Sequence, residues 1–282
     1  MKNLLKLSLI IFIVLFSACD VIEGPYIEGS TTGIDTTEKI VKKVLIEEYT
    51  GHLCINCPTA ALIIHDLKQL YGIQLTVIAV HSGYNATLAA PNFMTDFRTP
   101  VGNDLNSFFN IGDIAPKGVV NRTKFNNSYA LDKDAWGSAI SEILAKELEA
   151  NIKVEKTYNS VDSTVSITTN LEFFSEISDP IKLSAYFTED NIIDYQKNNN
   201  AEIGATPEIP DYAHMHVLRG ALNNTWGDEI LPSGSSNGLK TSKTIHGKLP
   251  NNIKNVDNVN LVVFIYNANT MEIIQVEEVK LK

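Results

Sequence analysis

The sequence contains little cysteine and no excess of positive charge. Only three of its 282 residues are cysteines, namely Cys19, Cys54 and Cys57, which excludes the dense disulfide framework of small secreted domains. Lysine and arginine number 23 against 33 acidic residues, so the formal net charge is -10. Nucleic-acid binding needs a basic surface that displaces counterions from phosphates, and this balance argues against it. Hydrophobic burial must therefore stabilise the fold.

Apolar runs long enough to cross a membrane are also absent. The run Leu7–Phe16 has ten residues, whereas a membrane-spanning helix needs about 20. Two lysines precede this run and the small pair Ser-Ala follows it, which is the pattern of a secretory signal peptide. We therefore assign residues 1–18 to an export signal.

Cys19 comes directly after this signal. The segment Leu15-Phe-Ser-Ala-Cys19 resembles the lipobox of bacterial lipoproteins, in which the cysteine is acylated and becomes the mature N-terminus. We expect residues 19–40 to form a lipidated N-terminus and a flexible tether, because they carry glycine, proline and hydroxyl residues without a hydrophobic period. The alternative is an ordinary secretory signal followed by a free thiol, a liability in an oxidising compartment.

Residues 41–149 alternate between strand and helix patterns. The expected elements are strands at 41–49, 74–81 and 114–122 and helices at 58–71 and 132–149, with helical pieces around 91–97 and 102–109. A strand, a helix and a strand in this order predict a right-handed βαβ unit at the start of the region.

From residue 150 the hydrophobic period changes to two. About seven strands without a strong helix predict an antiparallel β-sandwich of the Ig-like kind over residues 150–282. The polar segment 191–210 is rich in asparagine, proline and acids, so we expect a long surface loop there. The predicted fold class is α/β plus all-β, in two domains.

A Cys-x-x-Cys motif, Cys54-Ile-Asn-Cys57, lies between the first strand and the first helix. A helix N-terminus carries a partial positive charge, which favours the thiolate of Cys54 and makes it reactive. Cys57, one turn inside, would be less exposed and would resolve a mixed disulfide. We favour thiol–disulfide chemistry, with two alternatives open: a structural disulfide, although so short a loop stabilises little, and half of a metal site completed by His52 or His81.

The histidines are weaker candidates. His81 ends its strand at the sheet edge where ligands gather, but a packed, hydrogen-bonded histidine also fits there. His52 lies in the turn beside Cys54 and could stabilise a thiolate. His214 and His216 have a spacing that can bind a transition metal on one strand face, yet further ligands are not evident nearby, so we assign them a structural role. We predict no metal and no cofactor.

Residues 41–149 resemble the thioredoxin fold. The strand, the Cys-x-x-Cys motif and the helix come in the order of that family. Pro116 follows Ala115 at the start of the next core strand, where the family carries a cis-proline beside the dithiol. Glu48, six residues before Cys54, falls where the family has a buried acid.

This resemblance implies a role for each residue. Cys54 attacks a substrate disulfide or receives one, Cys57 resolves it, and Glu48 handles the proton, while Pro116 leaves edge groups free for an extended peptide. The alternatives are that Glu47 or Glu48 is the solvent-facing half of its strand and that the proline is an ordinary trans residue. Isoleucine and asparagine between the cysteines depart from the Gly-Pro of thioredoxin, so its redox potential does not carry over.

The whole chain is similar to one family of thioredoxin-like outer-membrane lipoproteins of Gram-negative bacteria, whose namesake is a twenty-eight-kilodalton outer-membrane protein. The similarity rests on the lipobox and tether, Cys-x-Asn-Cys-Pro, Pro-x-Gly-x-Val-Asn-Arg, and His-x-His-Val-Leu-Arg before a Trp-Gly. It implies a lipid-anchored protein at the outer membrane, periplasmic or surface-exposed, and leaves the substrate open.

The sequence therefore predicts an envelope lipoprotein that exchanges disulfides with exported proteins or peptides, anchored to the membrane through Cys19. Whether it is an enzyme stays open, as does the direction of exchange. The rival hypothesis is a non-enzymatic binding or adhesion lipoprotein that uses the β-sandwich, with a redox-inert thioredoxin-like scaffold.

Overall fold

The structure of the protein, a computed structural model, describes residues 40–282. The predictions for the signal peptide, for acylation of Cys19 and for the tether up to residue 39 lie outside the described residues. Residues 40–282 form one compact unit of mixed α and β structure in which strands predominate.

The described chain begins with a buried strand–helix–strand unit. β1 (Val44–Thr50) and β2 (Leu75–His81) pair in parallel, and every residue of both strands is buried. Such nearly continuous apolar runs suit strands that are covered on both faces. α2 (Cys57–Tyr71) connects the strands and packs on one face through Ala60 and Ile64. The βαβ unit predicted from the sequence is confirmed.

Two strands and two helices extend this unit. β3 (Lys117–Val120) pairs antiparallel with β1, and β4 (Ala130–Leu131) pairs with β3. α4 (Trp136–Leu144) lies on the same face of the sheet as α2, where the large side chain of Trp136 is fully buried. α3 (Pro100–Phe108) covers the opposite face.

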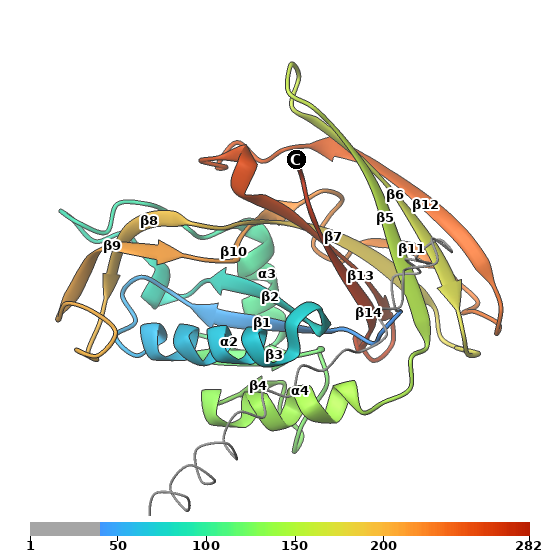
Figure 1. The fold of residues 1–282 in the computed structure, drawn as a ribbon, viewed down its shortest axis with the longest axis horizontal. Coiled ribbons are helices and arrows are strands. Elements are labelled where there is room, and N and C mark those ends of the chain that lie inside the picture. Colours follow the sequence, from blue (N-terminus) through green and yellow to red (C-terminus); the bar gives the residue numbers. More distant parts are fainter. Residues whose placement is uncertain (1–39) are drawn as a thin grey trace, which may run out of the picture. The chain divides into compact units, whose positions relative to one another are not determined.

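Strands from the C-terminal half continue the same sheet (Figure 1). They are β10 (Val217–Ala221), β7 (Ile181–Glu189), β13 (Val259–Asn267) and β14 (Ile273–Lys280), with β11 (Asp228–Leu231) paired to β7. β10 joins β2 in parallel, so the main path of this sheet within residues 40–282 runs β14-β13-β7-β10-β2-β1-β3-β4. Segments 41–149 and 150–282 therefore contribute strands to one sheet and belong to one compact unit.

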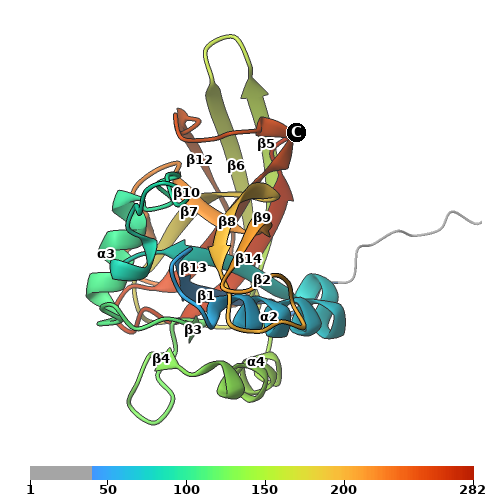
Figure 2. The same ribbon diagram turned by 90° about the vertical axis from the view of Figure 1, so that its left-hand side faces the viewer.

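A second, antiparallel layer packs on the C-terminal strands. In the described chain it consists of β12 (Lys240–Lys248), β6 (Thr164–Phe173) and β5 (Ala150–Asn159), and the turn between β5 and β6 extends past the other strands (Figure 2). Burial alternates along β6, so one face of this layer contributes to a core shared with β7 and β13. The antiparallel character predicted for this half is confirmed.

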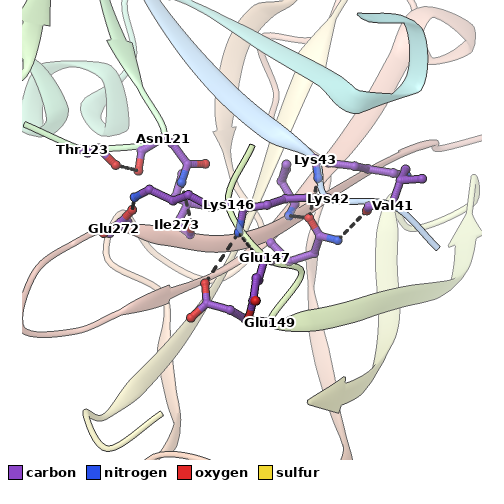
Figure 3. A network of polar contacts seen from close by, with 12 residues as sticks. Val41, Lys42, Lys43, Asn121, Thr123, Lys146, Glu147, Glu149, Glu272 and Ile273 are labelled. Carbon is purple, nitrogen blue, oxygen red and sulfur yellow. Dashed lines mark hydrogen bonds and ion pairs between the residues drawn. The ribbon is translucent and has the colours of Figure 1, made fainter. Parts of the chain in front are cut away.

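A polar network joins the two halves of the unit (Figure 3). The side chain of Gln275 in β14 accepts a hydrogen bond from the amide of Lys43 and donates one to the carbonyl of Val41, both at 2.9 Å. The side-chain amide of Asn121, just after β3, donates to the carbonyl of Ile273 at 2.6 Å. These bonds hold the start of β1 and the end of β3 against the C-terminal strand.

The polar segment 191–210 is not the surface loop that its composition predicts. It contains β8 (Ile192–Lys197) and the start of β9 (Glu208–His214), which pair as an antiparallel hairpin. Gln196 and Asn198 are buried because their side-chain amides donate to backbone carbonyls. Gln196 thus satisfies a carbonyl of the turn at Cys54, and Asn198 satisfies carbonyls of its own loop, instead of facing water.

Two smaller expectations also need correction. Residues 91–97 contain no helix, while the helix expected at 102–109 is α3, whose N-cap is the Thr99 hydroxyl. The helix expected at 132–149 is confined to α4 and the short 3₁₀ turn before it. The short turns are η1 (Gly72–Gln74), η2 (Tyr84–Ala86), η3 (Lys133–Ala135) and η4 (Val256–Asn258).

Candidate functional site

The Cys-x-x-Cys motif forms the turn between β1 and α2. Cys54 lies in the turn, Cys57 is the first residue of α2, and a disulfide joins them with their Cα atoms 5.4 Å apart. Pro58 suits the first turn of a helix, where its missing N–H has no intrahelical acceptor. Gly51 lets the turn pass closely by Asn85, because a Cβ there would lie 2.3 Å from the Asn85 carbonyl oxygen.

Both cysteines are buried, with 4% of Cys54 and 3% of Cys57 exposed. The sequence predicts that Cys57 is the less exposed of the two; the two values are almost equal, and the β8–β9 hairpin packs against the turn. The side-chain amide of Gln196 donates to the carbonyl of Cys54 at 2.9 Å and to that of Gly51 at 3.4 Å. Gln196 itself is only 2% exposed, so this contact is sealed from solvent.

Backbone groups after β8 continue this covering contact. The amide of Lys197 donates to the carbonyl of His52 at 2.8 Å, and the amide of Asn199 donates to the carbonyl of Ile55 at 3.2 Å. An extended segment thus follows the cysteine turn through main-chain hydrogen bonds, as a bound polypeptide does in strand-type recognition. This segment therefore covers the backbone of the cysteine turn.

The adjacent acids of β1 point to opposite faces of the sheet, and both are buried. Glu47 is 0% and Glu48 5% exposed, so the alternative that one of them faces solvent is wrong, because helices or strands cover both faces of β1. The Glu47 carboxylate accepts hydrogen bonds from Nε and Nη2 of Arg122 at 3.0 and 2.7 Å. The guanidinium lies 4.8 Å from the ring centre of Phe264, so aromatic packing surrounds the pair.

Glu48 lies on the other face, and no charged side chain of the part of the chain that the structure describes pairs with it. Its Oε1 has no hydrogen-bond partner among residues 40–282. Burial raises the pKa of this carboxyl to about 8, because desolvation penalises the charged form. A carboxyl with such a pKa can give or accept a proton near neutral pH.

A cavity of about 420 Å³ lies beside this carboxyl, between α2 and β9. Glu48, Cys57 and His81 line its buried part, together with Tyr212 and His214 of β9. The cavity places the predicted proton-handling group and one cysteine of the disulfide in a common space. Cys54 is not among its lining residues.

Pro116 directly precedes β3, and its bond to Ala115 is cis. Lys117, the first residue of β3, pairs with Tyr49 of β1. The proline therefore lies next to the end of β1 from which the cysteine turn departs. This position matches the one predicted from the order of the motifs.

Three histidine rings gather around Phe97. The ring centres of His81 and His214 lie 4.7 Å from that of Phe97, and the ring centre of His52 lies 5.7 Å away. Burial lowers the pKa of all three imidazoles, that of His214 to about 4, so they are neutral at pH 7. The ring of His52 contacts the Thr87 carbonyl at 2.8 Å. Packing in an aromatic cluster is thus part of the role of each ring.

The predicted pair His214 and His216 separates into two environments. His216 lies 3.2 Å from Asp190, while His214 packs in the aromatic cluster. Burial opposes ionisation of Asp190, but hydrogen bonds to His216 and its charge lower the pKa of Asp190 to about 2. Within the described chain, no group of three histidine, cysteine or acidic side chains is placed to hold a metal ion.

Sequence reasoning missed Gln196 and Tyr212 as members of the site. Gln196 contacts Cys54 across 142 residues of chain, and Tyr212 lines the cavity from β9. No local pattern marks either residue, because the hairpin reaches the dithiol only through tertiary contacts.

The fold and the site define a mixed α/β protein with a buried Cys-x-x-Cys disulfide at the carboxyl end of a central strand. The family model described as outer membrane protein Omp28 matches residues 104–282. The chain belongs to this family, which confirms the predicted family and the predicted location at the outer membrane. Within residues 40–282, no helix is long and apolar enough to span a membrane.

Solved structures share the fold at low sequence identity. HBP35 of Porphyromonas gingivalis is 19% identical, with a TM-score of 0.64 over 86% of this chain and 76% of that chain. Protein AGR_C_4864 from Agrobacterium tumefaciens is 12% identical, with a TM-score of 0.52 over 86% of this chain and 96% of that chain. Comparison with curated proteins gives no match. At these identities the similarity shows the fold alone.

Proposed function

We propose that this protein is a lipid-anchored thiol–disulfide exchange protein of thioredoxin-like architecture that acts on exported polypeptides. The observation that carries the proposal is the Cys54–Cys57 disulfide at the start of α2, with Cys57 and Glu48 lining the same cavity. A structural disulfide across so short a loop stabilises a fold little, whereas a reactive one gains from the helix N-terminus and a nearby acid.

The chemistry follows from this placement. A substrate thiolate attacks Sγ of Cys54, the bond to Cys57 breaks, and the departing Cys57 thiolate takes a proton from Glu48. A second substrate thiolate then attacks the substrate sulfur of the mixed disulfide and releases Cys54, so the substrate is oxidised and the cysteine pair reduced. In the reverse direction Glu48 accepts the proton of Cys57, and its pKa of about 8 suits both directions.

The lipobox supports the anchor. Leu15-Phe-Ser-Ala-Cys19 places a cysteine where bacterial lipoproteins are acylated. The match to an outer-membrane protein family supports the outer membrane as the one that the acyl chains would enter. Mass spectrometry of the mature N-terminus tests this step. An acylated Cys19 is expected, and a free thiol at this position would overturn it.

Trapping in the native envelope tests the exchange. In a Cys57→Ser variant, a mixed disulfide at Cys54 cannot be resolved, so adducts that disappear on reduction should accumulate and be identifiable by mass spectrometry. The Cys54→Ser/Cys57→Ser variant is the matched control and should form none. Absence of adducts, together with failure of the reduced protein to exchange with a small disulfide, would exclude the function.

One observation favours the rival function, a binding or adhesion lipoprotein with a redox-inert scaffold. The β8–β9 hairpin leaves only 4% of Cys54 exposed, so the disulfide is closed to large substrates in this conformation. The trapping result separates the two functions, because an inert scaffold forms no adducts even in cells that export many cysteine-containing proteins.

A further inference from the structure

The cavity between α2 and β9 has the size and the entrance of a small-molecule site. Its volume of about 420 Å³ lies within the range of such sites, roughly 300–1,000 Å³. Two large apolar side chains at its edge are exposed, Leu62 of α2 to 48% and Met215 after β9 to 45%. Exposed apolar side chains around a concave surface mark an interaction site more often than isolated ones do.

The inner wall of the cavity carries polar atoms without partners. Oε1 of Glu48 and both ring nitrogens of His81 make no hydrogen bond to any part of the chain between residues 40 and 282. Each buried unpaired group destabilises the protein, and a ligand with matching groups removes this cost. Nearby buried groups differ, since Glu47 is paired with Arg122 and His52 with a carbonyl.

The neutral state of the groups on this inner wall favours an uncharged ligand. Burial raises the pKa of Glu48 to about 8 and lowers the pKa of His81, so both are neutral at pH 7. A charged ligand would lose hydration without gaining a counter-charge from Glu48 or His81, and His216, which also lines the cavity, is already paired with Asp190 at 3.2 Å. The ammonium of Lys68 is already engaged, at 2.9 Å from the Leu75 carbonyl and 3.5 Å from Glu278. The neutral carboxyl offers an O–H donor, and the neutral imidazole offers one N–H donor beside one acceptor nitrogen, so an acceptor on the ligand can pair with both groups.

We propose that this cavity binds a small, uncharged, mostly apolar molecule whose buried end carries a hydrogen-bond acceptor such as a carbonyl oxygen. The apolar body contacts Leu62, Ile203 and Met215, and the acceptor binds at Glu48 and His81. The site lies against Cys57 but needs no disulfide exchange to be occupied, so it stands independently of the proposed function.

Three probes of similar size test the site by calorimetric titration of the oxidised full-length protein. Methyl naphthyl ketone should bind saturably, ethylnaphthalene should bind about fivefold more weakly for want of one hydrogen bond, and the naphthoate anion should not bind. Equal binding of the ketone and the hydrocarbon, tightest binding of the anion, or no saturable binding at all would overturn the proposal.

Two variants locate the binding. Ala61→Phe fills the cavity from α2 and should abolish ketone binding, while Leu70→Phe, on the same helix outside the cavity, should leave it unchanged. Glu48→Leu should weaken ketone binding to near the level of ethylnaphthalene, and it decides the question if Ala61→Phe does not fold. Ketone binding that survives both changes would place the ligand elsewhere and overturn the proposal.

Discussion

The adjacent glutamates Glu47 and Glu48 lie on opposite faces of β1 and have different environments. On one face Glu47 is paired with Arg122 at 2.7 Å, and both side chains are fully buried. On the other face Glu48 has no ionic partner among residues 40–282, and its pKa is raised to about 8 by burial. The two neighbouring glutamates thus differ in role. Glu47 belongs to a fixed ion pair, whereas Glu48 is a titratable group.

The difference shows how one strand can separate stability from chemistry. The Glu47–Arg122 pair lies among aromatic rings. Removal of either partner would leave the other charge buried and unpaired and would destabilise the protein. Glu48 instead lies beside the disulfide, in a cavity where its proton can be exchanged. Because side chains alternate along a strand, the two glutamates point to opposite faces of the sheet. The side chains packed on each face then decide whether the glutamate there is charged.

The largest effect is expected from breaking the pair. Arg122→Met leaves Glu47 buried without a counter-charge and should lower the free energy of unfolding by about 3–5 kcal/mol, measured by urea denaturation. A Glu47→Met/Arg122→Met double variant removes both charges and should recover much of this loss. A single variant as stable as the wild type would show that the pair does not stabilise this face.

The second effect is a pH dependence on the other face. Glu48 has a pKa of about 8 in the folded protein against its ordinary value of 4.5, so between these pH values the folded state retains a proton that the unfolded chain has lost. Stability therefore falls as pH rises, by up to roughly 1.4 kcal/mol per pH unit.

Glu48→Gln isolates this contribution. The difference in unfolding free energy between variant and wild type should grow in favour of the variant from pH 5 to pH 8. Shifts of the buried histidines occur in both proteins and cancel in this difference. A difference that stays flat with pH would show that Glu48 is charged in the folded protein at neutral pH.

Local sequence patterns predicted the strands and the face that carries Glu48 well. Apolar runs gave β1 and β2, and the motif order placed Cys54, Cys57 and Glu48 at one end of the sheet. The pairing of β10 with β2 and the partner Arg122 could not be predicted in this way, because both depend on contacts between distant segments. Polar composition around Gln196 even pointed to solvent, since hydrogen bonds to a remote backbone leave no periodic signal.

The third effect concerns the cover over the disulfide. Gln196→Ala removes the donor to the carbonyls of Cys54 and Gly51 and should cost about 1–3 kcal/mol. Because this loss falls on the hairpin that shields Cys54, reduction of the disulfide by a soluble phosphine should become severalfold faster. Gln74→Ala is the control, since Gln74 also donates to a backbone carbonyl, that of Lys42, but away from the disulfide. Equal reduction rates in both variants would show that the hairpin does not control access.

The smallest effect is expected at a surface pair that sharpens the contrast with the buried one. Lys117 and Asp132 also lie 2.7 Å apart, the same distance as in the Glu47–Arg122 pair, but the Asp132 side chain is 78% exposed. Water and salt screen such a pair, so Lys117→Met should change the unfolding free energy by less than about 1 kcal/mol in urea titrations. The change should shrink further in high salt, whereas the Arg122→Met loss should persist, because desolvation and not distance sets the difference between the pairs. Similar losses in the two variants would mean that burial does not distinguish them.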